Sequence, residues 1–115
     1  MCRNQQSRNQ NCLIDIADAI ELIAQYTQNC DRGELGTNME KQDAVLRRIM
    51  IIGEAAKRLS EDFRQQHSSV PWREIIGMYN IVAHDYDSVD LDEVWKVINI
   101  DLPELLKYVQ PLIDS

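Results

Sequence analysis

The sequence predicts an all-α protein, an up-and-down helical bundle with four main helices. Apolar residues recur at positions i, i+3, i+4 and i+7 through most of the chain, which is the spacing of one helix face. No segment shows the alternation typical of a β-strand, and the links between the periodic segments are short. With 115 residues, 44% of them hydrophobic, the chain is long enough for one compact domain.

The N-terminal part is expected to divide into a tail and a first helix. Residues 1–10 are polar, rich in Asn and Gln and without periodicity, so we expect a disordered tail before a helical domain over residues 11–115. The first helix is predicted from about Asn11 to Cys30. Its apolar stripe consists of Leu13, Ile16, Ala17, Ile20, Ile23, Ala24 and Tyr26.

A loop and a long second helix are predicted next. Residues 31–36 contain two glycines and no periodicity, which is typical of a loop. Thr37 and Glu40 have the spacing of a capping box, so the second helix is predicted over residues 38–65. Gly53 lies inside this helix at a cost of about 1 kcal/mol relative to Ala, which indicates a close approach to another helix. The predicted stripe is Val45, Ile49, Ile52, Ala56, Leu59 and Phe63.

Two further helices complete the predicted bundle. Pro71 is suited to the first turn of the third helix, and Asp90 with Glu93 marks the start of the fourth. Pro103 lacks a backbone donor and must kink or restart that last helix, which is expected to end near Pro111. The stripe of the third helix is Trp72, Ile75, Ile76, Tyr79, Val82, Ala83 and Tyr86, and that of the fourth is Leu91, Val94, Trp95 and Ile98.

Charge and cysteine content limit the function classes. The net charge of −7 argues against a general nucleic-acid coat protein, which needs a surplus of Lys and Arg. The acidity is concentrated in residues 85–115, whereas residues 37–84 carry seven basic and six acidic groups. No apolar run approaches the roughly 20 residues that span a bilayer, and no secretory signal is visible, so we expect a cytoplasmic protein with reduced Cys2, Cys12 and Cys30.

One polar stripe on the third helix is the candidate site: Arg73, Gly77, Asn80, His84 and Asp87 fall on one side of it. Asn80 and His84 are four residues apart and close enough to interact, and Gly77 leaves room for a ligand or a second backbone. His84 is the side chain suited to proton transfer at neutral pH. A structural histidine in an interhelical hydrogen bond is the alternative. His67 and His84 lie on different predicted elements without ligand spacing, so no metal or cofactor is expected.

Residues 72–78, Asn80 and residues 82–86 form a distinctive combination, with further characteristic residues at 52–56, 94–95 and 101–103. In these residues the chain resembles the HepT-like (DUF86) branch of the HEPN superfamily. The resemblance covers about Asn11 to Ile113, nearly the whole predicted bundle. The resemblance implies a HEPN helical bundle that forms a homodimer and acts on RNA as the toxin ribonuclease of a type VII toxin–antitoxin pair. The implied partner is a minimal nucleotidyltransferase (MNT-type) antitoxin, which neutralises the toxin by AMP transfer to the motif tyrosine.

The family signature Arg-x-x-x-x-His-x-Tyr, usually with Asn directly after Arg, is incomplete here. His84 matches the histidine, Asn80 the asparagine and Tyr86 the modified tyrosine, but Tyr79 occupies the arginine position. By resemblance His84 is the acid–base group of metal-independent RNA cleavage, and Tyr79 impairs that activity because it offers a neutral donor in place of a guanidinium. Arg73 is about 16 Å from His84 along one helix, so it cannot replace the missing arginine within one subunit.

Three functional hypotheses remain at this level. The first is an endoribonuclease toxin that is impaired through Tyr79, unless a partner subunit supplies an arginine. The second is an inactive helical binding module that docks to a nucleotidyltransferase or serves as its substrate through Tyr86. The third is a structural helical homodimer.

Overall fold

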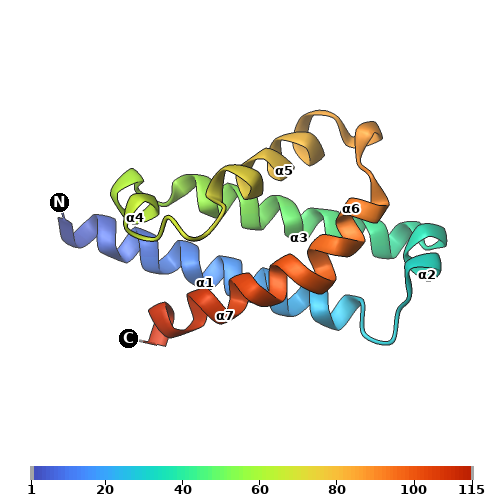
Figure 1. Ribbon diagram of the computed structural model, residues 1–115, viewed down its shortest axis with the longest axis horizontal. Helices are drawn as coiled ribbons and strands as arrows, with labels where there is room; N and C mark the ends of the chain where they lie inside the picture. Colours follow the sequence, from blue (N-terminus) through green and yellow to red (C-terminus); the bar gives the residue numbers. More distant parts are fainter. Residues whose placement is uncertain (1, 115) are drawn as a thin grey trace.

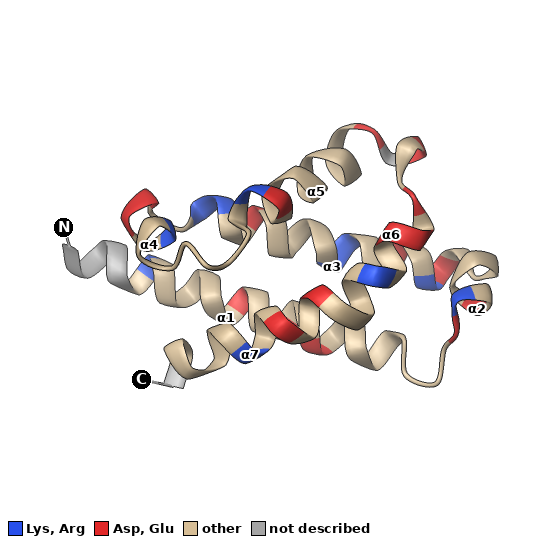
Figure 2. Cartoon of the chain, viewed as in Figure 1, with Lys and Arg blue, Asp and Glu red and all other residues tan. Residues whose placement is uncertain are grey.

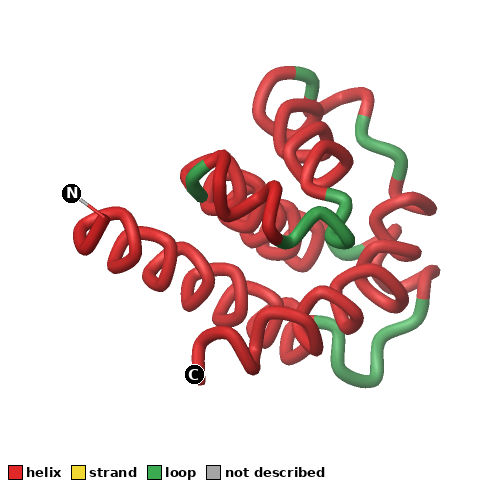
Figure 3. The backbone as a smooth tube through the Cα atoms, turned by 60° about the vertical axis from the view of Figure 1, so that its left-hand side comes forward, coloured by secondary structure: helices red, strands yellow, loops and turns green. Residues whose placement is uncertain are grey.

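Helices account for all the regular structure in the computed structural model of the chain, which describes residues 2–114; the side chains of residues 2–6, 86 and 114 lie outside the described part. The long elements are α1 (Cys2–Tyr26), α3 (Met39–Arg58), α5 (Trp72–His84) and α7 (Leu102–Asp114) (Figure 1). Short helices α2 (Arg32–Thr37), α4 (Glu61–Gln66) and α6 (Leu91–Lys96) connect them. No strand occurs within residues 2–114, which confirms the predicted all-α class (Figure 3).

Helix α3 lies in the middle of the bundle and packs against α1 on one side and α5 on the other, while α7 packs against α1. The predicted stripes of the first two helices supply much of the core, because their members at helical spacing turn toward the same neighbours. The side chains with almost no exposed surface are Leu13, Ile16, Ile23, Leu35, Val45, Leu59 and Val109. No helix of the described residues is long and apolar enough to cross a membrane.

The first helix begins earlier than predicted, at Cys2 instead of about Asn11, and ends at Tyr26 instead of Cys30. Asn9 donates a hydrogen bond to the Ser60 hydroxyl, and Gln10 donates one of 2.9 Å to the Ile113 carbonyl. These two residues, placed in the predicted tail, therefore contact the bundle. The side chains before Ser7 lie outside the described part, so a tail over the earlier residues stays a prediction.

The predicted loop at residues 31–36 is wrong, because this segment forms α2. Asp31 caps that helix by accepting a 2.7 Å hydrogen bond from the Glu34 amide. The predicted capping box is also wrong: Asn38 caps α3 by accepting a bond from the Lys41 amide. The Thr37 hydroxyl instead bonds to carbonyls of the preceding turn, so a polar side chain one residue later provides the cap.

The predicted second helix of residues 38–65 is divided in two. Helix α3 ends at Arg58, and Leu59 has an extended backbone conformation. The Ser60 side chain then accepts a 3.1 Å hydrogen bond from the Phe63 amide and so starts α4. Leu59 remains almost fully buried across the break, which explains why the apolar pattern alone did not reveal it.

The C-terminal region is one irregular helical rod. Asp90 caps α6 as predicted, through the amide of Asp92. A π-helical segment, Val97–Asp101, joins α6 to α7 just before Pro103, so the expected irregularity takes this form. The predicted end near Pro111 is wrong, because α7 continues through this proline to Asp114.

Candidate functional site

The two residues at the centre of the site lie at the C-terminal end of α5. His84 is the last residue of this helix and Asn80 lies one turn before it; both side chains are exposed. The chain then bends into a 3-10 turn, Tyr86–Ser88. Helix α5 is held by α3 along its opposite face, so the exposed face of α5 carries the polar stripe (Figure 1).

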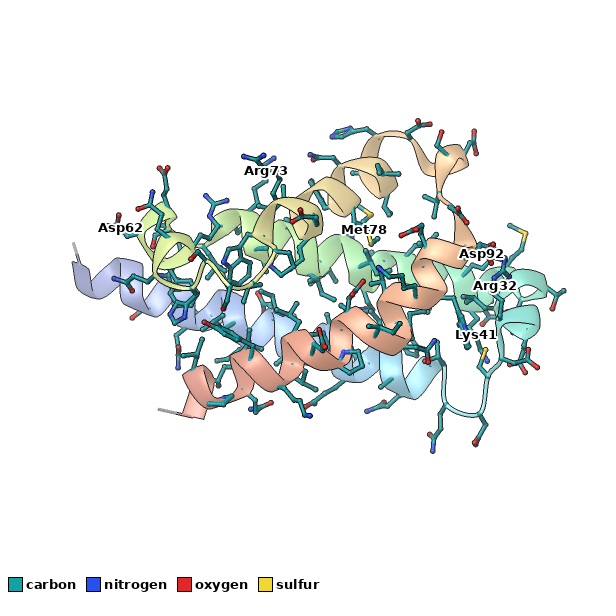
Figure 4. The ribbon with its side chains drawn as sticks, viewed as in Figure 1. Arg32, Lys41, Asp62, Arg73, Met78 and Asp92 are labelled. Carbon is teal, nitrogen blue, oxygen red and sulfur yellow. The ribbon has the colours of Figure 1, made fainter. Side chains whose placement is uncertain are left out.

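Most of the predicted stripe lies on α5, but its last member does not. Arg73, Gly77, Asn80 and His84 lie on α5, whereas Asp87 belongs to the 3-10 turn that follows. Figure 4 shows Arg73 pointing away from the bundle. A Cβ at Gly77 would meet no atom within 4 Å, so space is open beside the stripe.

His84 does not fit the alternative of a structural histidine. Its imidazole is exposed and makes no hydrogen bond to another described side chain or backbone group of this subunit. The other histidine, His67, takes the structural role: its Nδ1 lies 2.9 Å from the Tyr108 hydroxyl, and its ring contacts Phe63. The imidazole of His84 is therefore free to meet a ligand or a second subunit.

Tyr79 fits closely against α3. A methyl group added at Gly53 would overlap the Tyr79 Cβ and come within 3.0 Å of its Cγ, so the two helices approach at this pair. The predicted role of Gly53 is thereby confirmed. The ammonium of Lys57 lies 5.6 Å from the centre of the Tyr79 ring, within the range of a cation–π interaction. Tyr79 is therefore a half-buried packing residue, and the Lys57 ammonium lies over its ring.

Positive side chains flank this part of the molecule. Arg47 on α3 and Arg73 on α5 are exposed, and neither joins an ion pair or hydrogen bond among the described residues. Lys57 contacts the Tyr79 ring without a carboxylate partner, whereas Arg58 pairs with Glu54 at 3.0 Å. Figure 2 shows Lys and Arg residues along α3 and near the start of α5, and acidic residues on α6 and the segment that leads into it. Arg47, Arg73 and Lys57 are thus cations of the described part that an anionic ligand could meet.

The groups with shifted pKa values lie elsewhere. Burial raises the pKa of the Cys12 thiol, and it is the main cause of the raised pKa of Cys30, so both thiols stay protonated at neutral pH. A hydrogen bond to Glu34 raises the pKa of the Lys41 ammonium. No group of three His, Cys, Asp or Glu residues in the described part is arranged to hold a metal ion.

One feature was missed at the sequence level: an apolar groove beside α5. Gly77, Met78 and Ile81 line it together with residues from the α6 to α7 rod. Ile81 is 49% exposed, although it follows directly after Asn80 in a helix whose other apolar residues are mostly covered. An apolar residue outside the predicted stripe was the available signal.

Comparisons with known proteins agree on one family. The family model described as Ribonuclease HepT-like matches residues 16–112. A "Probable ribonuclease HepT" of Thermococcus cleftensis is 40% identical over 81% of this chain and 84% of its own length. The "Putative RNase MJ1380" of Methanocaldococcus jannaschii is 35% identical over 85% of this chain and 90% of its own length.

Another relative is longer than this chain. The "Gamma-glutamylcyclotransferase and putative RNase MJ0434" of Methanocaldococcus jannaschii is 38% identical over 87% of this chain. The chain spans only 45% of the length of that relative. No solved structure matches the chain.

Proposed function

Because this chain belongs to the HepT-like ribonuclease family, we propose that it is the toxin of a toxin–antitoxin pair and a metal-independent RNA endonuclease of the cytoplasm. His84 is the acid–base group, Asn80 assists it, and Tyr79 lowers the activity. The observation that carries this proposal is the pair of exposed side chains, one helical turn apart, at the end of α5. Neither is engaged by a described group of its own subunit, and both are accessible to a phosphodiester.

The proposed chemistry needs a base, an acid and a positive charge. The 2'-hydroxyl of RNA attacks the adjacent phosphorus while His84 accepts its proton, and the bond to the 5'-oxygen of the next nucleotide breaks as that oxygen receives a proton from water. Negative charge grows on the phosphate oxygens, and a guanidinium in the family position would stabilise it. Loss of such a donor costs on the order of 10² to 10³ in rate, so the chain should cleave RNA slowly.

We propose Arg47, the exposed arginine of α3 near the level of His84, as the cation that replaces the family arginine. Helices α3 and α5 run antiparallel and approach where Gly53 contacts Tyr79. At a rise of 1.5 Å per residue, Arg47 lies about 9 Å along the helix axis from Gly53, and His84 lies about 7.5 Å along it from Tyr79. Because the two helices are antiparallel, both residues lie toward the same end of the helix pair. Lys57 lies in the opposite direction. Arg47 is also exposed and without an ion-pair partner among the described residues.

The Tyr79→Arg substitution tests the nuclease. Arginine retains a Cβ, so its contact with Gly53 is retained and the fold should persist. The variant should cleave a labelled RNA at least about 10²-fold faster than the chain as given and arrest growth when expressed alone. Adding His84→Ala should remove both effects, while Arg73→Ala should leave most of the cleavage. A correctly folded Tyr79→Arg protein that leaves RNA intact would contradict the nuclease proposal.

A binding role is the second candidate, with Tyr86 as acceptor of AMP from an MNT-type nucleotidyltransferase. It is favoured by the position of Tyr86 at the start of the turn directly after α5, two residues from His84, where added AMP would obstruct the same site. Intact-mass measurement after co-expression with the neighbouring nucleotidyltransferase tests it. Each AMP should disappear in Tyr86→Phe and persist in Tyr26→Phe.

A homodimer is part of the proposal. The exposed polar stripe on α5, which carries Asn80 and His84, supports a two-fold arrangement in which the partner faces the site. Sedimentation velocity of the full chain over a range of concentrations tests it. A monomer at all concentrations would contradict the dimer without deciding the chemistry.

A further inference from the structure

An open apolar groove of about 810 Å³ runs between α5 and the rod formed by α6, the π-helical segment and α7. Its floor is apolar, and the side chains that matter for the argument are Ile75, Met78, Ile81, Val89, Val97 and Leu105. The polar site residues Asn80 and His84 do not line it.

The groove lies where α5, which packs mainly against α3, diverges from α6. The contact of Gly53 with Tyr79 fixes α5 against α3, and α5 diverges from α6 beyond that point (Figure 1). Figure 4 shows Met78 on the side of α5 that faces α6. Ile81 keeps 49% of its surface exposed, and Gly77 leaves space for a Cβ on the same helix. An apolar surface of this kind commonly marks a binding site for another molecule.

The rim of the groove is acidic. Among the described residues that line it, five carry carboxylates and one carries an amine: Glu74, Asp90, Glu93, Asp101, Glu104 and Lys96. The single amine is already paired, because the Lys96 ammonium lies 3.7 Å from Asp101. Figure 2 shows the same concentration of acidic residues on α6 and on the segment that leads into it. The groove therefore combines an apolar floor with a negative potential.

We propose that this groove binds an amphipathic helix of another protein, with apolar residues on one face and Lys or Arg on its flanks. The apolar face of the bound helix would cover Met78 and Ile81 on α5. Its flanking cations would pair with Glu93 and Glu104 on the α6 to α7 side of the groove. A second copy of this chain is the poorer occupant. In a two-fold pairing of groove with groove, each acidic rim would face an identical acidic rim. The proposal does not depend on ribonuclease activity.

Model peptides of opposite charge provide the direct test. A fluorescein-labelled 18-residue peptide of Leu and Lys at amphipathic helical spacing should bind the full chain with one peptide per chain, measured by fluorescence anisotropy at moderate salt. The matched Leu and Glu peptide should not bind. The double variant Glu93→Lys, Glu104→Lys should weaken binding at least about ten-fold through like-charge repulsion, and Ile81→Ser should weaken it several-fold.

Two controls separate the groove from general charge and from misfolding. The double variant Asp18→Lys, Glu21→Lys makes the same change in net charge on exposed positions of α1, outside the groove, and should retain most of the affinity. The neutral pair Glu93→Gln, Glu104→Gln should lie between the parent and the reversed protein, and circular dichroism checks that each variant is helical.

Three results would overturn the proposal. One is equal binding of both peptides, and another is equal loss of affinity in the groove and α1 double variants. The third is a homodimer in sedimentation velocity that Ile81→Ser dissociates and that the Leu and Lys peptide does not displace, because a second copy would then occupy the groove.

Discussion

Helices α3 and α5 approach closely at Gly53 and Tyr79, because a Cβ on Gly53 would overlap the Cβ of Tyr79. This pair has two consequences. It fixes the distance between α3 and α5, the helix that carries Asn80 and His84. It also places residue 79, where the family has arginine, in a packed contact. The Cβ of any residue at position 79 must therefore pack against Gly53. The Tyr79→Arg substitution keeps this contact, because arginine also has a Cβ.

The two glycines of this helix pair should respond oppositely to alanine. Gly53→Ala gains about 1 kcal/mol of helix propensity, but the overlap with Tyr79 forces the helices apart, so we expect a net loss of about 1–3 kcal/mol. Gly77→Ala meets no atom within 4 Å and should gain about 0.5–1 kcal/mol. Urea unfolding followed by circular dichroism measures both. A stabilised Gly53→Ala variant would mean that the two helices do not approach as described.

The helical class, the central core and the role of Gly53 were accessible from the sequence because each depends on local spacing. Leu13 and Ile16 follow a 3.6-residue period, and both are buried in α1, the helix that packs against α3 and α7. Gly53 interrupts good helix formers, which indicated a neighbouring helix. The adjacency of Asn80 and His84 follows in the same way from their separation of one helical turn.

The division of the second helix and the groove beside α5 could not be predicted from the sequence. The first depends on which of several possible capping residues is used, and the second depends on how the helices diverge. Leu59 fits the apolar spacing of α3 even though its backbone is extended. The sequence pattern therefore gave no sign that α3 ends at Arg58. Asn38 and Thr37 are both acceptable caps, and only the three-dimensional structure distinguishes them. Ile81, an apolar residue outside the predicted stripe, indicated an unfilled surface, but the groove itself depends on the angle between α5 and α6.

Ser60 should be the most sensitive serine of the chain. Its hydroxyl caps α4 by accepting from the Phe63 amide at 3.1 Å, and it also accepts a 3.2 Å bond from Asn9 of α1. Ser60→Ala should therefore cost about 0.5–2 kcal/mol of unfolding free energy. Ser69→Ala, at an exposed position in the next loop, is the matched control and should change stability by less than about 0.5 kcal/mol. Equal effects would argue against the cap.

The loop between α4 and α5 is fastened to the bundle by two hydrogen bonds at His67. The Trp72 indole donates to the His67 carbonyl at 3.0 Å, and the Tyr108 hydroxyl lies 2.9 Å from His67 Nδ1. Tyr108→Phe removes only a half-exposed bond and should cost about 0.5–1 kcal/mol. Trp72→Phe removes the buried donor and part of a buried ring, so it should cost more, about 1–3 kcal/mol. Thermal unfolding that ranks them in reverse would contradict this assignment.

Arg47 should matter most when position 79 lacks a guanidinium. In the chain as given, Arg47→Ala should lower the slow cleavage of a labelled RNA by about ten-fold or more, because it removes the proposed cation on the level of His84. In the Tyr79→Arg background the same change should have a small effect, since an arginine is again present in the family position. Lys57→Ala, on the opposite side of Tyr79, is the matched control and should be mild in both backgrounds. Equal losses in both backgrounds would assign Arg47 to general RNA binding, and no loss in either would leave the charge to a second subunit.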